Sequence, residues 1–173
     1  MERKVVVTRP RSDDERFATP VAPQVLEDVA ERLRERNFEA FVVADGGEAR
    51  RVVLARIPEG AEVHAGRSKT LEDAGVAAIT LDGLMVAASA TGSQLGPYAS
   101  GAGRLILVIG AQNVVPDLDT ALRRVHDYVF PWEMARVRET MGVDTVLAKV
   151  LLIEREWLAG RTTVVLVRST IGV

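Results

Sequence analysis

The chain contains no cysteine among its 173 residues. This absence excludes disulfides, thiolate nucleophiles, zinc–thiolate sites and iron–sulfur ligation by the chain itself, so an electron-transfer role would need a cofactor held by other means. Histidine is almost as scarce: the two residues, His64 and His126, are not spaced against each other or against a carboxylate pair. We therefore expect no zinc or iron site. His64 could by its location act as a general base, but a histidine at the end of a strand more often has a structural role.

Long apolar runs are also absent. No stretch approaches the roughly 20 residues that a membrane helix requires, and the amino terminus lacks the apolar core of a secretory signal. These absences predict a cytoplasmic protein without membrane insertion. The 22 basic and 24 acidic residues leave a net charge of −2, which gives no electrostatic reason to expect a nucleic acid as partner. An anionic small ligand would need only a local positive charge.

The sequence does contain short apolar runs that alternate with amphipathic stretches. Its length suffices for one substantial core but not for two ordinary domains. We expect a single domain over 1–173, and we leave 1–16 open as an irregular amino-terminal extension. The alternation predicts an α/β fold, with an open, mostly parallel sheet flanked by helices on both faces in three layers.

Helices are expected where apolar residues recur at helical spacing, and strands where short apolar runs lie between turn signals. The expected helices are 25–36, a segment after Gly47 that reaches Arg56, a short one around 71–74, 118–129 and 132–140. The expected strands are 38–43, 61–65, 76–80, 84–88, 105–109, 150–153 and 163–167. Asp82-Gly83 predicts a tight hairpin, and 105–109 is expected to be a central strand buried on both faces.

The first candidate site is the loop that leads into the expected helix around 71–74. Backbone amides at a helix start, two hydroxyls and two basic side chains could together hold a phosphate or carboxylate. The residues are Gly66, Arg67, Ser68, Lys69 and Thr70. Helix capping explains the same hydroxyls, because Thr70 and Asp73 have capping-box spacing and Ser68 can itself be the N-cap. A phosphate-binding P-loop is excluded, because Ser68 stands where that motif needs glycine.

The second candidate site is the loop after the strand 84–88. Thr91, Gly92, Ser93 and Gln94 combine two hydroxyls and a side-chain amide with a flexible glycine, which suits hydrogen bonding to a polar ligand. The alternative is a Gly-Ser turn with a solvated Gln94. Lys149, just before an apolar strand, could bring charge into a cleft or could block pairing at a sheet edge.

Several ordered segments resemble the lactate-utilisation (LUD) domain family, from about residue 17 to the end. The turn 57–63 and the helix start 68–75 resemble that family's pattern, and so does the long central loop with its Gly-Ser-Gln-Leu sequence at 92–95. Further similar segments are 82–83, 101–104, 114–124, 149–153, 160–161 and 166–172.

The resemblance implies an open α/β fold similar to coenzyme A transferases and sugar-phosphate isomerases. It also implies an association with bacterial lactate oxidation, where related proteins accompany iron–sulfur subunits. It supplies no catalytic residue and no cofactor. Coenzyme A transferases of similar fold use a glutamate nucleophile, and 76–113 contains no glutamate, which disfavours a transferase.

Two functions of different class remain open. In one, the protein is an enzyme acting on a small anionic metabolite held between the two candidate loops. In the other, it is a non-catalytic accessory or regulatory subunit that binds an iron–sulfur partner protein in lactate oxidation. Self-association also stays open, because Trp132 and Trp157 are expected either in the core or in a subunit contact.

Overall fold

The computed structural model describes residues 14–63 and 76–172. Its α-helices are α1 (Asp14–Ala18), α2 (Pro23–Glu35), α3 (Gly46–Leu54), α4 (Leu118–Arg124) and α5 (Phe130–Met141). Its strands are β1 (Glu39–Val43), β2 (Ala78–Thr80), β3 (Met85–Ser89), β4 (Leu105–Gly110), β5 (Val114–Val115), β6 (Lys149–Ile153) and β7 (Thr162–Val167). Short π-helical segments occur at Pro97–Gly101 and Val125–Val129, and a 3-10 turn at Ala111–Asn113.

The strands form two sheets. In sheet A, β7 lies between β1 and β4, and both pairings are parallel. In sheet B the order is β5-β2-β3-β6; β2 is parallel to β5, and β3 is antiparallel to β2 and β6. The predicted open α/β architecture is confirmed, but the single sheet that the sequence predicted is divided in two.

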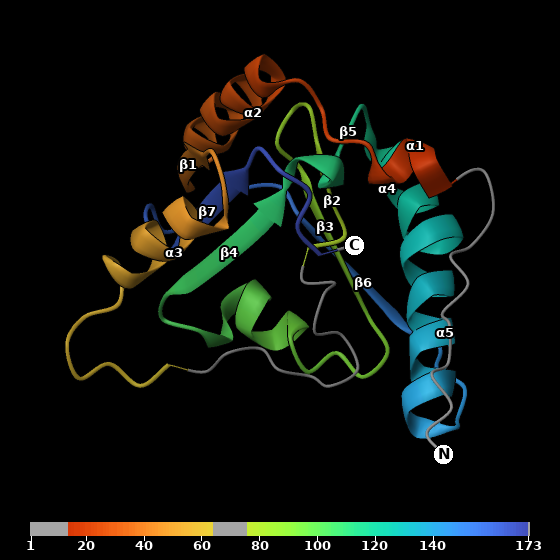
Figure 1. Cartoon of the computed structure of the whole chain (residues 1–173). Helices are drawn as coiled ribbons and strands as arrows, with labels where there is room; N and C mark the ends of the chain where they lie inside the picture. The colour runs from red at the N-terminus through yellow and green to blue at the C-terminus, as the bar shows by residue number, and fades with distance from the viewer. Residues whose placement is uncertain (1–13, 64–75, 173) are drawn as a thin grey trace.

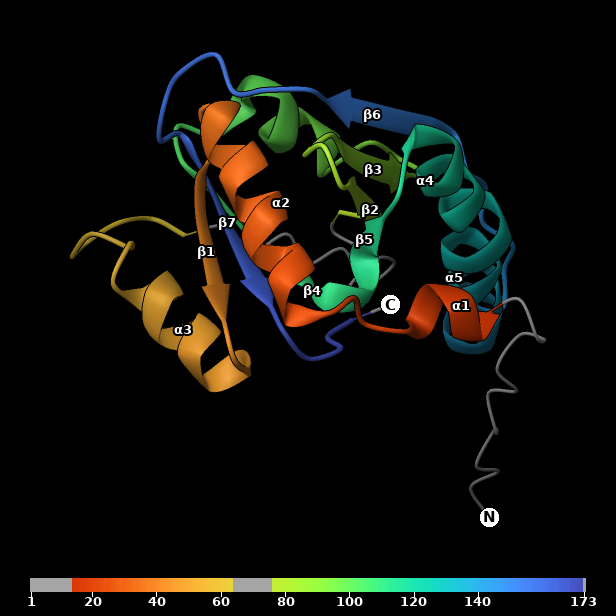
Figure 2. The same cartoon turned by 90° about the horizontal axis from the view of Figure 1, so that it is seen from above.

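Helix α2 joins the two sheets through one core (Figures 1 and 2). Its apolar face, which includes the fully buried Leu26 and Leu33, packs with sheet A residues such as Leu166 and with sheet B residues such as Ile79. On the far side of sheet A, α3 packs against β7. On the far side of sheet B, α4 and the segment after it pack against β2 and β3. Helices therefore cover both outer faces.

The helix boundaries follow local chemistry. The Asp45 side chain caps α3 by accepting a hydrogen bond from the Glu48 amide at 2.9 Å, and the Glu48 carboxylate reaches back to accept one from the Ala44 amide at 2.8 Å. Asp117 caps α4 through the Thr120 amide at 2.7 Å. Within the described ranges, every helix is too short or too polar to cross a membrane.

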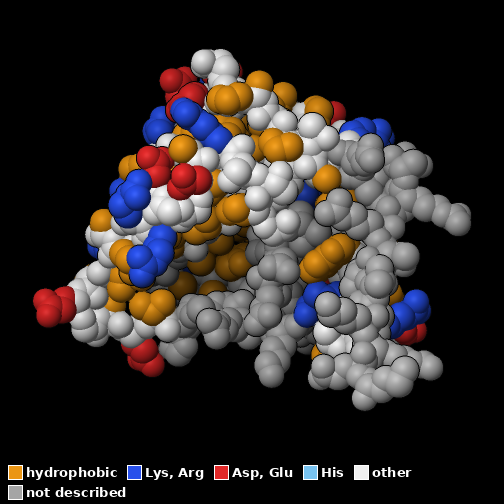
Figure 3. Space-filling model, viewed as in Figure 1, with side chains coloured by type: hydrophobic (Ala, Val, Ile, Leu, Met, Phe, Trp, Pro, Cys, Tyr) orange, Lys and Arg blue, Asp and Glu red, His pale blue; other side chains and the backbone are white. Residues whose placement is uncertain are grey.

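Two sequence-based expectations about strands are wrong. Residues 105–109 do form a strand, but β4 pairs only with β7 among the described residues and Val108 is 43 % exposed, so β4 is an edge strand there. Hydrophobic side chains are visible on this face of the molecule in Figure 3. The segment Ala61–Val63 is not a strand; the rest of 61–65 and the helix expected around 71–74 lie outside the described residues. An apolar run in the sequence indicates a strand, but it does not indicate the position of that strand in the sheet.

The two tryptophans, both predicted to lie in the core or in a subunit contact, differ in their positions. Trp132 packs against the core of sheet B, as predicted. Trp157 is 83 % exposed in the connection between β6 and β7, so it does not anchor the core.

Candidate functional site

The Thr91–Gln94 loop follows directly from the end of β3. Because β3 and β6 are antiparallel, the last residue of β3, Ser89, lies opposite the first residue of β6, Lys149. The structure therefore brings Lys149 next to the Thr91–Gln94 loop, although the two are far apart in the sequence.

Hydrogen bonds within the loop fix its shape. The buried Ser89 hydroxyl accepts from the Gly92 amide at 2.8 Å and donates to Gln94 Oε1 at 3.0 Å. Gln94 Nε2 donates to the Ala88 carbonyl at 3.2 Å. Gln94 is thus half-buried and holds the loop against β3, rather than being solvated as the alternative interpretation expected. Its amide is a positioning group.

The hydroxyls of Thr91 and Ser93 are on the exposed side of the loop. Thr91 Oγ1 donates to Ser93 Oγ at 3.2 Å and accepts from the Ser93 amide at 3.3 Å. Both residues are exposed, so these groups can also reach a bound molecule.

Gly92 is the point at which Lys149 meets the loop. Its φ of +87° lies in the region that favours glycine, and a Cβ there would lie 2.8 Å from Lys149 Cδ. The lysine side chain therefore passes over Gly92 towards the loop rim. Lys149 forms no ion pair within the described part of the chain, and it lies on the edge strand β6, so both roles predicted for it remain open.

A small pocket of about 100 Å³ opens beside this loop. Its lining is mainly apolar and comes from β3 and the following loop, the helical segment after α4, and the turn before β6. The lining residues are Ala88, Ser89, Ala90, Thr91, Val125, Val129, Phe130, Glu133, Thr145, Val146 and Leu147. A polar rim beside an apolar floor is the usual arrangement of a small-molecule site.

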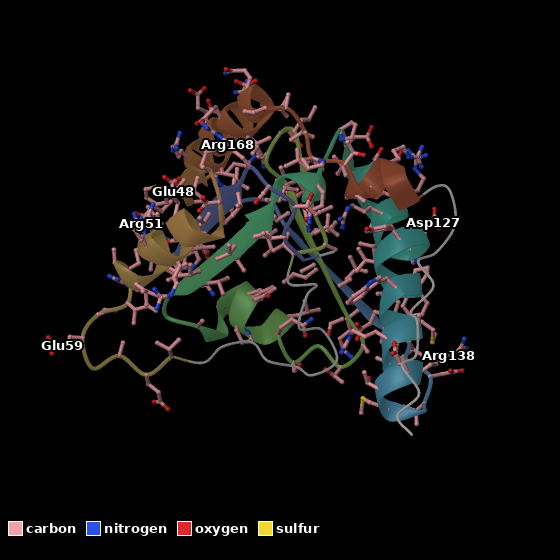
Figure 4. The ribbon with its side chains drawn as sticks, viewed as in Figure 1. Glu48, Arg51, Glu59, Asp127, Arg138 and Arg168 are labelled. Carbon is pink, nitrogen blue, oxygen red and sulfur yellow. The ribbon has the colours of Figure 1, made fainter. Side chains whose placement is uncertain are left out.

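Glu133 contributes a charged group to this pocket that was not predicted from the sequence. It is only 5 % exposed, and Arg136 donates to its two oxygens at 2.9 and 3.0 Å. A signal was present, because Glu133 falls at the same i+4 spacing as Val125, Val129 and Val137 on the buried face. On the same helical run, Asp127 and Arg138 point away from the sheets (Figure 4).

Gly66, Arg67, Ser68, Lys69 and Thr70 lie outside the described residues, as does His64. His126 is exposed on the segment after α4. Within 14–63 and 76–172, no group of three or more His, Asp or Glu side chains is arranged to hold a metal ion.

Comparisons with known proteins support the fold. No protein-family model matches the chain, and no curated protein matches it. Among solved structures, the chain is similar to a DUF162 family protein from Deinococcus radiodurans, with a TM-score of 0.51 and 14 % sequence identity. The match covers 86 % of this chain and 99 % of that one. At this identity the likeness establishes a shared open α/β fold.

Proposed function

We propose that this protein is a LUD-type protein of bacterial lactate utilisation that binds a small anionic metabolite beside the Thr91–Gln94 loop. DUF162 is the LUD-domain family, so the similar structure and the ordered sequence resemblance support the same family. The observation that carries the site is the meeting of Lys149 with this loop next to a pocket of about 100 Å³.

The chemistry of this site suits a short carboxylate. The Lys149 ammonium supplies a positive charge, and the exposed Thr91 and Ser93 hydroxyls supply hydrogen bonds. Val125 and Val129, which are both buried, offer an apolar floor for a methyl group. The small volume favours a molecule of a few heavy atoms, such as a 2-hydroxy or 2-oxo acid, over a nucleotide.

A thermal-shift screen tests this function. Lactate should raise the melting temperature, whereas coenzyme A, nucleotides, folates and sugar phosphates should not. The effect should disappear in Ser93→Ala, which removes a rim hydroxyl, and persist in Ser100→Ala, which removes an exposed hydroxyl elsewhere. Stabilisation by coenzyme A or a nucleotide but not by lactate would contradict the proposal.

An exposed apolar strip favours a second function, that of an accessory subunit for an iron–sulfur partner. We define the apolar strip by four side chains around the edge strand β6: Val143, Val146, Val150 and Leu152, each at least 40 % exposed. Exposed apolar patches of this kind occur at protein interfaces.

Co-purification with the iron–sulfur subunit of a lactate-oxidising complex tests this second function. We expect Leu152→Glu to abolish the association and Leu54→Glu, at a 52 % exposed position on α3, to leave it intact. Equal retention of the partner by both variants would rule out the apolar strip as the contact.

A further inference from the structure

A second, larger cleft of about 530 Å³ opens at the amino ends of the sheet A strands. Glu39, Leu105 and Thr163, at or near the starts of β1, β4 and β7, form its base, and residues 55–58 and Gly160 form its walls. None of its lining residues belongs to the pocket beside Thr91. Its volume falls within the roughly 300–1,000 Å³ that small-molecule sites occupy.

One wall of this cleft contains an arginine whose charge is neutralised by a carboxylate. Arg56 Nε and Nη2 donate to the two Glu39 oxygens at 2.9 and 2.8 Å, and the guanidinium lies 3.9 Å from the centre of the Phe41 ring. Thr163 Oγ1 also donates to Glu39, at 2.7 Å. The hydrogen bond from Arg56 is the largest cause that lowers the pKa of Glu39, so this carboxylate stays ionised and compensates Arg56.

A second arginine of the lining is also compensated. Arg161 is 7 % exposed, and its Nη1 lies 2.7 Å from a carboxylate oxygen of the buried Glu156. Its other nitrogens donate to the carbonyls of Pro97 at 2.8 Å and Ala102 at 3.0 Å. Arg161 therefore fixes the wall of the cleft and has few donors left for a ligand.

Arg104 is different. It lines the same cleft, is exposed, and forms no hydrogen bond or ion pair within the described part of the chain. The Arg104 charge also helps to lower the pKa of the nearby Glu39, but the Glu39 oxygens are hydrogen-bonded to Arg56 and Thr163, so the Arg104 guanidinium keeps its donors for a ligand. The walls of the cleft also include Ile57, Pro58 and Ile106. The planar guanidinium fork suits the paired oxygens of a carboxylate or phosphate.

We propose that this cleft is a second binding site, in which Arg104 holds the oxyanion of a small organic phosphate or carboxylate and the apolar wall residues hold its carbon body. The cleft is independent of the lactate-type site, because it lies at the amino ends of sheet A and shares no lining residue with that site.

Amide NMR titration of the full chain tests the second site. Glycerol 1-phosphate and glutarate are the two probes, and they distinguish a phosphate from a carboxylate ligand. We expect saturable shifts at the Arg104, Leu105 and Gly160 amides with one of them. Arg104→Gln should weaken this binding about tenfold, as loss of a charge-assisted hydrogen bond predicts. Arg50→Gln, at an exposed position on α3 outside the cleft, should bind like the parent.

Three outcomes overturn the second site. They are the absence of saturable shifts with both probes, equal binding by the parent and Arg104→Gln, and shifts confined to Thr91 and Val146. The last outcome would move the anion to the other pocket and leave the proposed function intact. Conversely, binding of a probe in the cleft without any response to lactate would support the second site and would not support the proposed function.

Discussion

At the scale of single residues, Gly92 decides whether the candidate loop can approach Lys149. Its positive φ of +87° strains any residue with a side chain, and a Cβ there would collide with the lysine stem. The loop's inward hydrogen bonds, from the Gly92 amide and Gln94 to the end of β3, depend on this conformation.

We expect Gly92→Ala to lower the free energy of unfolding by about 1 kcal/mol or more, because alanine must adopt a left-handed backbone. Gly96→Ala is the matched control, since Gly96 has a φ of −59° and a Cβ there would meet nothing within 4 Å. Urea unfolding measures both variants. An equal effect of the two substitutions would contradict the role assigned to Gly92.

The buried pair Glu156–Arg161 is a second residue-scale feature. Burial by itself would raise the pKa of Glu156, but the hydrogen bonds from Thr162 and Arg161 and the charge of Arg161 together lower it from the ordinary 4.5. A lowered folded-state pKa contributes stability that is fully present above the unfolded value and is lost as the pH falls through the folded value. The stabilisation is therefore present at neutral pH and declines below about pH 4.5.

We expect Glu156→Gln to cost about 3 kcal/mol or more at neutral pH, because it leaves the Arg161 charge buried without its counterion. The difference from the parent should shrink as the pH falls below 4.5 and through the lowered folded-state pKa of Glu156, where the parent also loses the charge. Asp144→Asn is the control, because its pair with Arg138 is mostly exposed. Urea unfolding across this pH range measures the effect, and a pH-independent difference would contradict it.

At the scale of elements, the end of α2 connects three parts of the chain. Arg36 donates to the Asp82 carbonyl of the β2–β3 hairpin at 2.8 Å and to the Glu154 carbonyl after β6 at 2.7 Å. The next residue, Asn37, has a φ of +67° and donates from its side chain to the Glu156 carbonyl at 2.8 Å. The helix terminus thus fixes the hairpin and the β6–β7 connection.

Arg36→Ala should destabilise the fold by about 2 kcal/mol, because charged donors to two carbonyls are lost. Hydrogen exchange should accelerate first at the hairpin amides of Gly83 and Leu84. Arg32→Ala, which removes only an exposed pair with Glu35 inside α2, serves as the control. Unchanged exchange at the hairpin in Arg36→Ala would show that the helix end does not fix it.

The local elements could be predicted from the sequence, and their order in the sheets could not. The apolar spacing of α2, the run of β1 and the Asp82-Gly83 hairpin depend on residues close in sequence, and all three are confirmed. Among the described residues β4 is at a sheet edge because it pairs only with β7, and no short-range pattern of apolar residues determines that contact.

At the scale of the whole molecule, one core spans both sheets. Leu33 is fully buried among residues of sheet A and sheet B. We expect Leu33→Ala to lower the free energy of unfolding by about 2–5 kcal/mol. Both sheets should be destabilised together. Leu158→Ala, at a 51 % exposed position, should have little effect. Hydrogen exchange at β2 and β7 amides measures this, and unfolding of one sheet alone would contradict a shared core.

The candidate site also has one part that could be predicted from the sequence and another part that could not. The polar loop Thr91–Gln94 could be predicted, because its glycine and hydroxyl residues lie together in the sequence. Its contact with Lys149 could not, since it depends on the pairing of β3 with β6 across a long connection. The internal bonding of Gln94 also depends on the folded position of Ser89. The Gly66–Thr70 prediction stays untested.

The most direct test of the proposed function is a titration of the full chain with sodium lactate, followed by amide NMR. A small-anion site at this loop predicts saturable shifts at Thr91, Ser93 and Val146, their loss in Lys149→Gln, and their retention in Arg50→Gln. Absence of saturable shifts, or identical binding by the parent and Lys149→Gln, would contradict a small-anion site at this loop.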